Sequence, residues 1–309
     1  MPAYSRGMAS MALSAVAFSV MAALVKLAGP TFPNQELVAL RSLASILPIL
    51  AIAGWRKVPL RVHRPGWLFV RGFLGYLAIS CWFVSLNHLS LPDSVMIQYT
   101  SPVFVSLLAP FFLKERSAAR ERFALAIALA GVVLVVRPGL GLTASGALVG
   151  LAGAVCSAGA YVTIRALRHS DHPVIVMLAF PSVAAACGLL VMLTAPSLGF
   201  AAGWIWPDGR GWLMLSGIAL MTAAGQVFLT YGLQHEPAGR ATVATYLAVV
   251  VSIPLGIALF GQWPDIWMVL GGSMVIGAVA TLSLTSHRPV PPPAGAGAGQ
   301  MPEPLTLDG

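Results

Sequence analysis

Charge is scarce in this sequence. Only 9% of its 309 residues are Asp, Glu, Lys or Arg, whereas about a quarter of a soluble globular domain is charged. The ten acidic residues all lie near the ends of apolar segments, in connections or in the C-terminal tail. The composition therefore excludes a water-soluble globular protein. The carboxylate positions also disfavour an ion-coupling acid at the middle of a membrane.

The motifs that carry phosphate or covalent chemistry are missing. The chain has no GxxxxGK[ST] loop, no HExxH pair and no GxSxG turn. Its three cysteines, Cys81, Cys156 and Cys187, lie inside apolar segments without paired spacing, which is typical of small packing residues. The sequence therefore excludes ATP-driven activity and predicts neither a metal site nor a cofactor.

Long apolar runs take the place of charge: 58% of the residues are hydrophobic and the mean hydropathy is +0.84. A helix of about 20 apolar residues crosses a hydrocarbon core about 30 Å thick and satisfies its own backbone hydrogen bonds there. The first run exceeds the core of a signal peptide, so we interpret it as an uncleaved span. The sequence predicts an all-α integral membrane protein with ten transmembrane helices, over residues 7–28, 36–54, 66–87, 93–113, 121–137, 145–166, 173–194, 211–234, 240–260 and 265–285.

The 18 basic residues predict how these helices are oriented. With a cytoplasmic N-terminus, Arg137 and Arg210 lie outside, and Lys26, Arg41 and Arg71 lie within spans. The other thirteen lie inside: Arg6, Arg56, Lys57, Arg61, Arg64, Lys114, Arg116, Arg120, Arg122, Arg165, Arg168, Arg240 and Arg288. Since basic loops stay in the cytoplasm, both termini are expected there, in a bacterial-type inner membrane.

The two ends of the chain are expected to lie outside the bundle. Residues 1–6 form a short cytoplasmic N-terminus, and the Pro- and Gly-rich residues 287–309 form a disordered cytoplasmic tail. The net charge of +8 is explained by the cytoplasmic loops. Membrane lipid is therefore an expected partner, and nucleic acid is not.

The chain also contains an internal repeat, of residues 7–138 and 145–286. A shift of 147 residues superposes Leu86 on Leu233, His88 on His235, Tyr99 on Tyr246 and Val103 on Val250, and is expected to hold without a gap. Because each unit has five spans, the second is inverted relative to the first. The same shift places the charged residues 114–116 on the uncharged residues 261–263, as expected if these connections face opposite sides.

Two inverted five-helix units point to a transporter. Inverted repeats let two halves exchange inward and outward shapes around a site near the bilayer midplane. The sequence therefore predicts a secondary transporter, whether exporter, importer or exchanger, of small amphipathic metabolites such as amino acids, their derivatives or drugs. The alternatives are a non-transporting or channel-like membrane protein and, less favoured, a membrane-embedded enzyme.

Four stretches carry a resemblance to a known family. They are "AFSVMAALVKLAG" (17–29), "LVALRSLASILPIL" (37–50), "SPVFVSLLAPFFLKERSAARERFALAIALAGVVLV" (101–135) and its repeat "YLAVVVSIPLGIALFGQWPDIWMVLGGSMVIGAV". Together they resemble the EamA-type family of the drug/metabolite transporter superfamily over residues 7–285. The resemblance implies ten helices in two five-helix repeats and a transport function. The second repeat departs from the family pattern, with Val249 in place of the Pro at 102 and Gln262 in place of the acid at 115.

Polar and aromatic residues inside the spans are the candidate site, because such groups usually face a bundle rather than lipid. Each could instead serve helix packing. The substrate-binding candidates are Arg41, Trp82, Gln98, Tyr99, Tyr161, Gln226, Tyr231, Thr245 and Tyr246. The candidates for gating or structural roles are Lys26, Pro102, Glu115 and Pro254.

Several of these candidates have two interpretations. Arg41 could attract an anionic or zwitterionic substrate, or it could cap carbonyls or snorkel. Lys26 is expected to snorkel, and Glu115 to form a local salt bridge or to couple to gating. The proline candidates permit kinks. The small-residue pairs Gly146/Gly150 and Ser273/Gly277 permit close helix approach, within the chain or in a homodimer.

Overall fold

The structure is a computed structural model. It describes residues 3–55, 57–58, 61–113, 123, 126–128, 130–131, 133–134, 143–167, 170–194, 203–235 and 247–285. Several predicted features lie outside the described residues: Glu115, Thr245, Tyr246, most of the span over 121–137, and the tail over 287–309.

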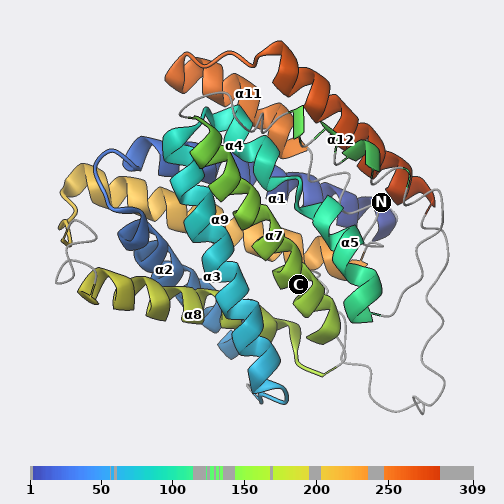
Figure 1. Cartoon of the computed structure of the whole chain (residues 1–309). Helices are drawn as coiled ribbons and strands as arrows, with labels where there is room; N and C mark the ends of the chain where they lie inside the picture. Colours follow the sequence, from blue (N-terminus) through green and yellow to red (C-terminus); the bar gives the residue numbers. More distant parts are fainter. Residues whose placement is uncertain are drawn as a thin grey trace, which may run out of the picture.

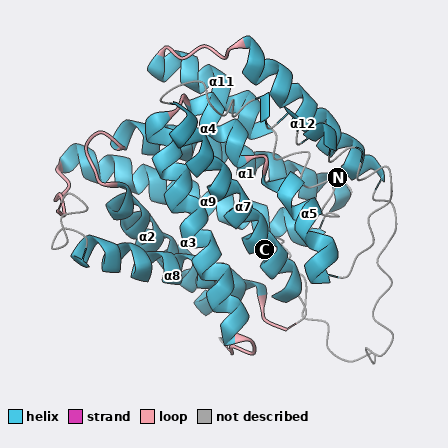
Figure 2. Ribbon diagram, in the orientation of Figure 1, coloured by secondary structure: helices cyan, strands magenta, loops and turns pink. Residues whose placement is uncertain are grey.

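All regular structure in the described ranges is helical (Figures 1 and 2). Six helices are long and apolar enough to cross a membrane: α1 (Ala3–Ala28), α2 (Asn34–Trp55), α3 (Pro65–His88), α7 (Thr143–Leu167), α8 (Pro173–Thr194) and α9 (Gly209–His235). The shorter apolar helices are α11 (Leu247–Phe260) and α12 (Ile266–Thr285). The all-α prediction is confirmed for this part of the chain.

The predicted span over 93–113 is not one helix. It is divided into α4 (Leu91–Gln98) and α5 (Ser101–Leu113), which are separated by Tyr99 and Thr100. Pro102 explains the break, because proline has no amide proton and its ring clashes with the carbonyl four residues earlier in a continuous helix. The carbonyl of Ile97 accepts from the Thr100 hydroxyl at 2.6 Å and from the Thr100 amide at 3.1 Å. By contrast, Pro254 lies inside a continuous α11.

The equivalent helices α2 and α8 lie side by side and run antiparallel (Figure 1). A Cβ on Gly188, near the end of α8, would lie 3.2 Å from the Cβ of Ala39, near the start of α2. At the other end, Ile49 and Ala53 of α2 pack on Val174 at the start of α8. The two helices therefore cross the bundle in opposite directions.

Two further helix pairs repeat one arrangement. The first helix of the first half, α1, packs antiparallel on α9, where Ser10 and Ser14 donate to the carbonyls of Phe228 and Gly225, each at 2.9 Å. The first helix of the second half, α7, packs on α3. There Gly146 contacts His88 and Gly150 contacts Ser85. The predicted close approach at Gly146/Gly150 is thus made within the chain.

The helix positions correct the expected repeat offset. The helices α2 and α8 are offset by 139 residues at both ends, and so are the last residues of α1 and α7. From the last residues of α3 and α9 onward the offset is 147 residues. The gap-free shift is therefore wrong for the first two helices. The second half has eight extra residues between the ends of α8 and α9.

The bundle has two ends, which we name after a residue at each. At the Lys26 end, the Lys26 ammonium donates to the carbonyls of Leu86 and Leu89, and Asn87 donates to Asn34. At the Asp171 end, the backbone amide of His63 donates to the Asp171 carboxylate. Consequently α2 starts at the Lys26 end and α3 starts at the Asp171 end.

Candidate functional site

Arg41 of α2 is buried in the centre of the bundle, with 2% of its surface exposed. Its guanidinium carbon lies 5.5 Å from the ring centre of Phe83 in α3 and 5.4 Å from that of Phe180 in α8. One terminal nitrogen donates to the Thr222 hydroxyl of α9 over 3.4 Å, and the Nε atom has no partner among the described residues. Arg41 therefore does not snorkel to an interface.

Arg71 of α3 is the second buried cation, with 7% of its surface exposed. Its guanidinium carbon lies 5.3 Å from the Phe180 ring centre, and its Nε atom has no partner in the part of the chain that the structure describes. The phenol of Tyr161 in α7 interacts with it electrostatically. Arg71 was placed inside a span by its sequence position, but it was not among the site candidates.

The two arginines share the Phe180 ring. Their guanidinium carbons lie 5.4 and 5.3 Å from the same ring centre, so they are at most about 11 Å apart. Burying an ion costs several kcal/mol even after the protein relaxes around it. A desolvated cation–π contact offsets about 2 kcal/mol or more of that cost. No carboxylate pairs with either guanidinium among the described residues. The cluster thus has an excess of positive charge that can stabilise an anion.

Gly75 creates the space for this cluster. A Cβ at this position of α3 would lie 2.5 Å from Cδ2 of Phe180 and 2.7 Å from Nη1 of Arg71. Only a residue without a side chain lets the Phe180 ring approach α3 and lets the Arg71 guanidinium lie along its own helix at this position. The contact between Arg71 and Phe180 therefore depends on a backbone position one turn away.

Two predicted binding tyrosines are near this cluster. Tyr161 interacts electrostatically with Arg71, and Tyr99, at the break between α4 and α5, interacts electrostatically with Tyr161. Tyr161 is therefore linked electrostatically both to Arg71 and to the helix break. Among the predicted site residues, Arg41 lies in the cluster, and Tyr161 and Tyr99 are linked to it by electrostatic interactions.

The remaining described candidates lie around the cluster. Gln98 donates to the Ser157 hydroxyl at 2.7 Å and so ties α4 to α7, while its side-chain oxygen is buried without a partner among the described residues. Trp82 is buried, with its ring centre 6.3 Å from that of Phe83 and its indole N–H without a partner in the described ranges. Gln226 and Tyr231 are half-buried on α9. Helix packing accounts for the observed Gln98 bond.

Lys26 has a structural role in this conformation. Its ammonium donates to the carbonyls of Leu86 at 2.6 Å and Leu89 at 2.5 Å, and lies 5.6 Å from the Phe260 ring centre. These carbonyls are at the end of α3, where helix carbonyls lack partners within the helix and a cation is favourable. Lys26 therefore caps α3 instead of snorkelling.

Polar contacts close the Lys26 end. The fully buried Glu36 accepts a hydrogen bond from the backbone amide of Ile205 at 3.0 Å. Gln262, which occupies the place of the family's acid in the second half, accepts from the amide of Leu91 at 2.8 Å. A neutral amide oxygen is sufficient for that bond. These contacts join connections of one half to helices of the other.

The Asp171 end is held by one buried carboxylate. Asp171 accepts hydrogen bonds from the His63 amide and the Ser170 hydroxyl, both at 2.8 Å, and its oxygen lies 3.8 Å from the imidazole of His63. Burial alone would raise the pKa of this carboxyl. These bonds, the backbone of Arg64 and the nearby imidazole together lower the pKa below its ordinary value.

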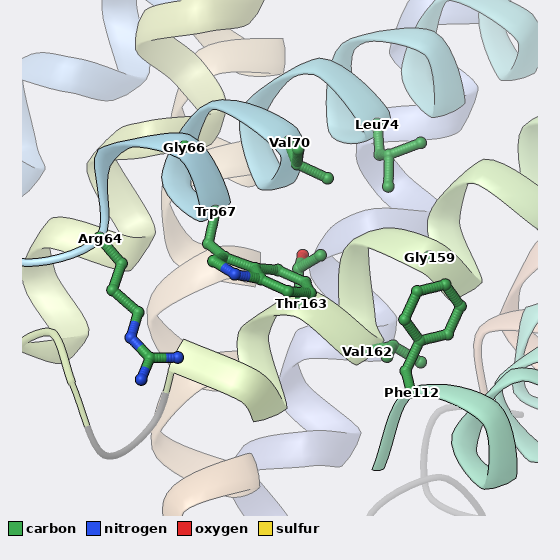
Figure 3. Close-up of a pocket in the computed structure, with 9 residues that line it drawn as sticks. All are labelled: Arg64, Gly66, Trp67, Val70, Leu74, Phe112, Gly159, Val162 and Thr163. Carbon is green, nitrogen blue, oxygen red and sulfur yellow. The ribbon is translucent and has the colours of Figure 1, made fainter. Parts of the chain in front are cut away.

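A separate groove of about 640 Å³ lies between α3, α5 and α7 (Figure 3). Trp67, Val70 and Leu74 of α3 face Val162 of α7 and Phe112 of α5 across it, and Arg64 is at its edge. The groove is apolar and contains none of the predicted substrate-binding residues. The lining of this groove can bind a hydrocarbon chain, whereas the arginine cluster can bind a negatively charged group.

Sequence reasoning missed Arg71, Phe180, Phe83 and Thr222. A signal existed for Arg71, because a cation within an apolar run is itself a site indicator. Phenylalanine and threonine inside a span carry no such signal. In the described ranges, no group of three or more His, Cys, Asp or Glu side chains gathers that could hold a metal ion.

The long apolar helices are those of a polytopic helical membrane protein. The EamA-like transporter family matches residues 5–137 and again residues 144–284. Because this match covers most of the chain, the protein belongs to that family, and the family domain is duplicated within it.

Individual relatives agree with this assignment. The chain is 32% identical over 280 residues to the pseudopaline exporter CntI of Pseudomonas aeruginosa, covering 88% of this chain and 94% of that protein. It is 29% identical over 297 residues to solute carrier family 35 member G1 of Mus musculus, covering 89% and 77%. A solved crystal structure with 21% identity and a TM-score of 0.66 covers 91% of this chain and 99% of that one, which shows a shared fold.

Proposed function

We propose that this protein is a secondary transporter that moves small amphipathic metabolites by alternating access at a central site. The observation that carries the proposal is the buried Arg41, which extends from α2 of the first half to Phe180 and Thr222 of the second half. This cation lies at the junction of the two halves and has no carboxylate partner among the described residues. It can therefore bind an anionic group of a substrate. The membership of the EamA-like transporter family supports the same function.

The proposed architecture is ten helices in two inverted repeats. It is supported by the antiparallel packing of α2 and α8, and by the matching pairs α1 with α9 and α7 with α3. A twofold axis in the membrane plane exchanges such helices and passes between α2 and α8. We place both termini in the cytoplasm and the protein in a bacterial-type inner membrane, because of the distribution of basic residues.

In this mechanism the two ends of the bundle open in turn. The contacts of Glu36 and Gln262 close the Lys26 end, and the contact of Asp171 with the His63 amide closes the Asp171 end. Alternating access requires that one set breaks while the other holds. The break between α4 and α5 is the place where a helix segment can tilt with little loss of hydrogen bonds.

The test is transport by the purified protein in liposomes. A panel of amino acids, their acetylated derivatives, and mono- and dicarboxylates is loaded inside, and both efflux and exchange are followed. Outward movement comes first in the test, because one relative is an exporter by name. Arg41→Gln is expected to reduce transport of the active compound at least tenfold, and the exposed Arg210→Gln is expected to leave it unchanged.

Two results would overturn the proposal. One is the failure of the folded protein to move any panel member in either direction. The other is stepwise single-channel current in planar bilayers, which indicates a pore instead of alternating access.

A further inference from the structure

We infer that Arg41 and Arg71 form one binding site for a small dianion, with one anionic group of the substrate held by each guanidinium. The inference rests on the proposed transport function and adds to it the charge of the substrate. Its basis is that two buried cations, not one, approach the same ring and lack a carboxylate among the described residues.

The two guanidiniums come from opposite ends of the bundle. Arg41 is the eighth residue of α2, which starts at the Lys26 end, and Arg71 is the seventh residue of α3, which starts at the Asp171 end. With a rise of about 1.5 Å per residue, each lies roughly 10 Å inside its own end. Both side chains then reach to Phe180, so the pair spans the central part of the bundle.

The hydrogen-bonding capacity of this pair is mostly unused. A guanidinium has five N–H donors in a planar fork that matches a carboxylate. Among the described residues Arg41 makes one long hydrogen bond, to Thr222, and the Nε atoms of both arginines have no partner. Cation–π contacts with aromatic rings hold both side chains in place without using their donors. A site held in this way keeps its donors for a ligand.

The separation of the cations limits the size of the ligand. Because the guanidinium carbons are at most about 11 Å apart, two carboxylates joined by a short chain can each face one of them. The ring of Phe180 between the cations offers an apolar surface to that chain. Short dicarboxylates and acidic amino acids or their derivatives have this shape, and longer diacids do not.

The experiment measures binding to the purified full-length protein in detergent, with pairs of compounds that differ by one negative charge. The pairs are succinate and monomethyl succinate, glutarate and monomethyl glutarate, and N-acetylglutamate and N-acetylglutamine. At least one dianion is expected to bind about tenfold or more tightly than its singly charged partner, since charge-assisted bidentate contacts are strong. Equal affinity within every pair, or no binding of any dianion, overturns the inference.

Variants then assign the second charge to Arg71. Arg71→Gln is expected to raise the Kd of the preferred dianion about tenfold and to leave that of the singly charged partner within about twofold. Arg64→Gln, which removes an exposed cation beside the start of the same helix, is the matched control and is expected to keep the preference. Retention of the preference by Arg71→Gln, or its equal loss in Arg64→Gln, contradicts the assignment.

A folding defect in Arg71→Gln would not prevent the test. Arg71→Lys keeps the charge but loses the planar fork, and is expected to keep part of the preference for the dianion. Full retention of wild-type affinity in Arg71→Lys rules out a bidentate contact. Transport of zwitterions or cations without binding of any dianion overturns this inference and leaves the proposed function intact.

Discussion

Gly75→Ala is the substitution that tests the central cluster most directly. The added Cβ would lie 2.5 Å from Cδ2 of Phe180 and 2.7 Å from Nη1 of Arg71. Non-bonded carbon atoms prefer a separation of about 3.5–4.0 Å, so the ring must retreat by about 1 Å or α3 and α8 must move apart. Neither movement is easy, because Phe180 is buried within the main hydrophobic core.

The magnitude follows from two opposing terms. Overpacking of a filled core costs about 1–3 kcal/mol. Replacing glycine by alanine inside a helix stabilises it by about 1 kcal/mol, which offsets part of that cost. We therefore expect a net loss of up to about 2 kcal/mol, together with weaker substrate binding, because both guanidiniums are positioned on the displaced ring.

The assay compares the apparent Tm in detergent at one scan rate, since membrane proteins commonly unfold irreversibly. Gly66→Ala is the matched control, because it lies in the same helix and its Cβ would meet nothing within 4 Å. The control is expected to match or slightly exceed wild-type stability and to bind substrate normally. A Gly75→Ala protein with wild-type stability and affinity would refute the close packing of Phe180 against α3.

Three further predictions follow from the ends of the bundle and the helix break. Lys26→Met should cost about 1–3 kcal/mol and lower the apparent Tm, because it leaves the carbonyls of Leu86 and Leu89 without their donor; an unchanged Tm would exclude the cap. The folded-state pKa of Asp171 is below its ordinary value, so the stability it contributes is present above about pH 4 and is lost as the pH falls through the folded pKa. Asp171→Asn should therefore lower the Tm at pH 7 and flatten the decline of Tm in acid, and an unaltered acid decline would contradict this. Pro102→Ala should slow turnover in liposomes with little change in substrate affinity, because α4 and α5 can then join; unchanged turnover would show that the break is not needed for transport.

The sequence by itself determined the class of protein and most of the helices. Long apolar runs have one stable backbone form in lipid, so composition and run length suffice to predict an all-α membrane protein. The duplication could also be recognised, because the two halves keep the same order of apolar runs and connections. Arg41 could be nominated as a site residue, since a cation within an apolar run requires a partner or a ligand.

Only the tertiary structure decided what those residues do. Whether Lys26 snorkels or caps a helix depends on which carbonyls another helix places within its reach, and those belong to residues 86 and 89. The break at Tyr99 and Thr100 depends on how the chain responds to Pro102, for which a kink and a break are both possible. The shared Phe180 ring joins cations from α2 and α3 to a third helix, α8, and phenylalanine in an apolar run carries no signal of its own. Hydrophobic patterning specifies that helices form and are buried, whereas the meeting of particular side chains is a property of how those helices are packed.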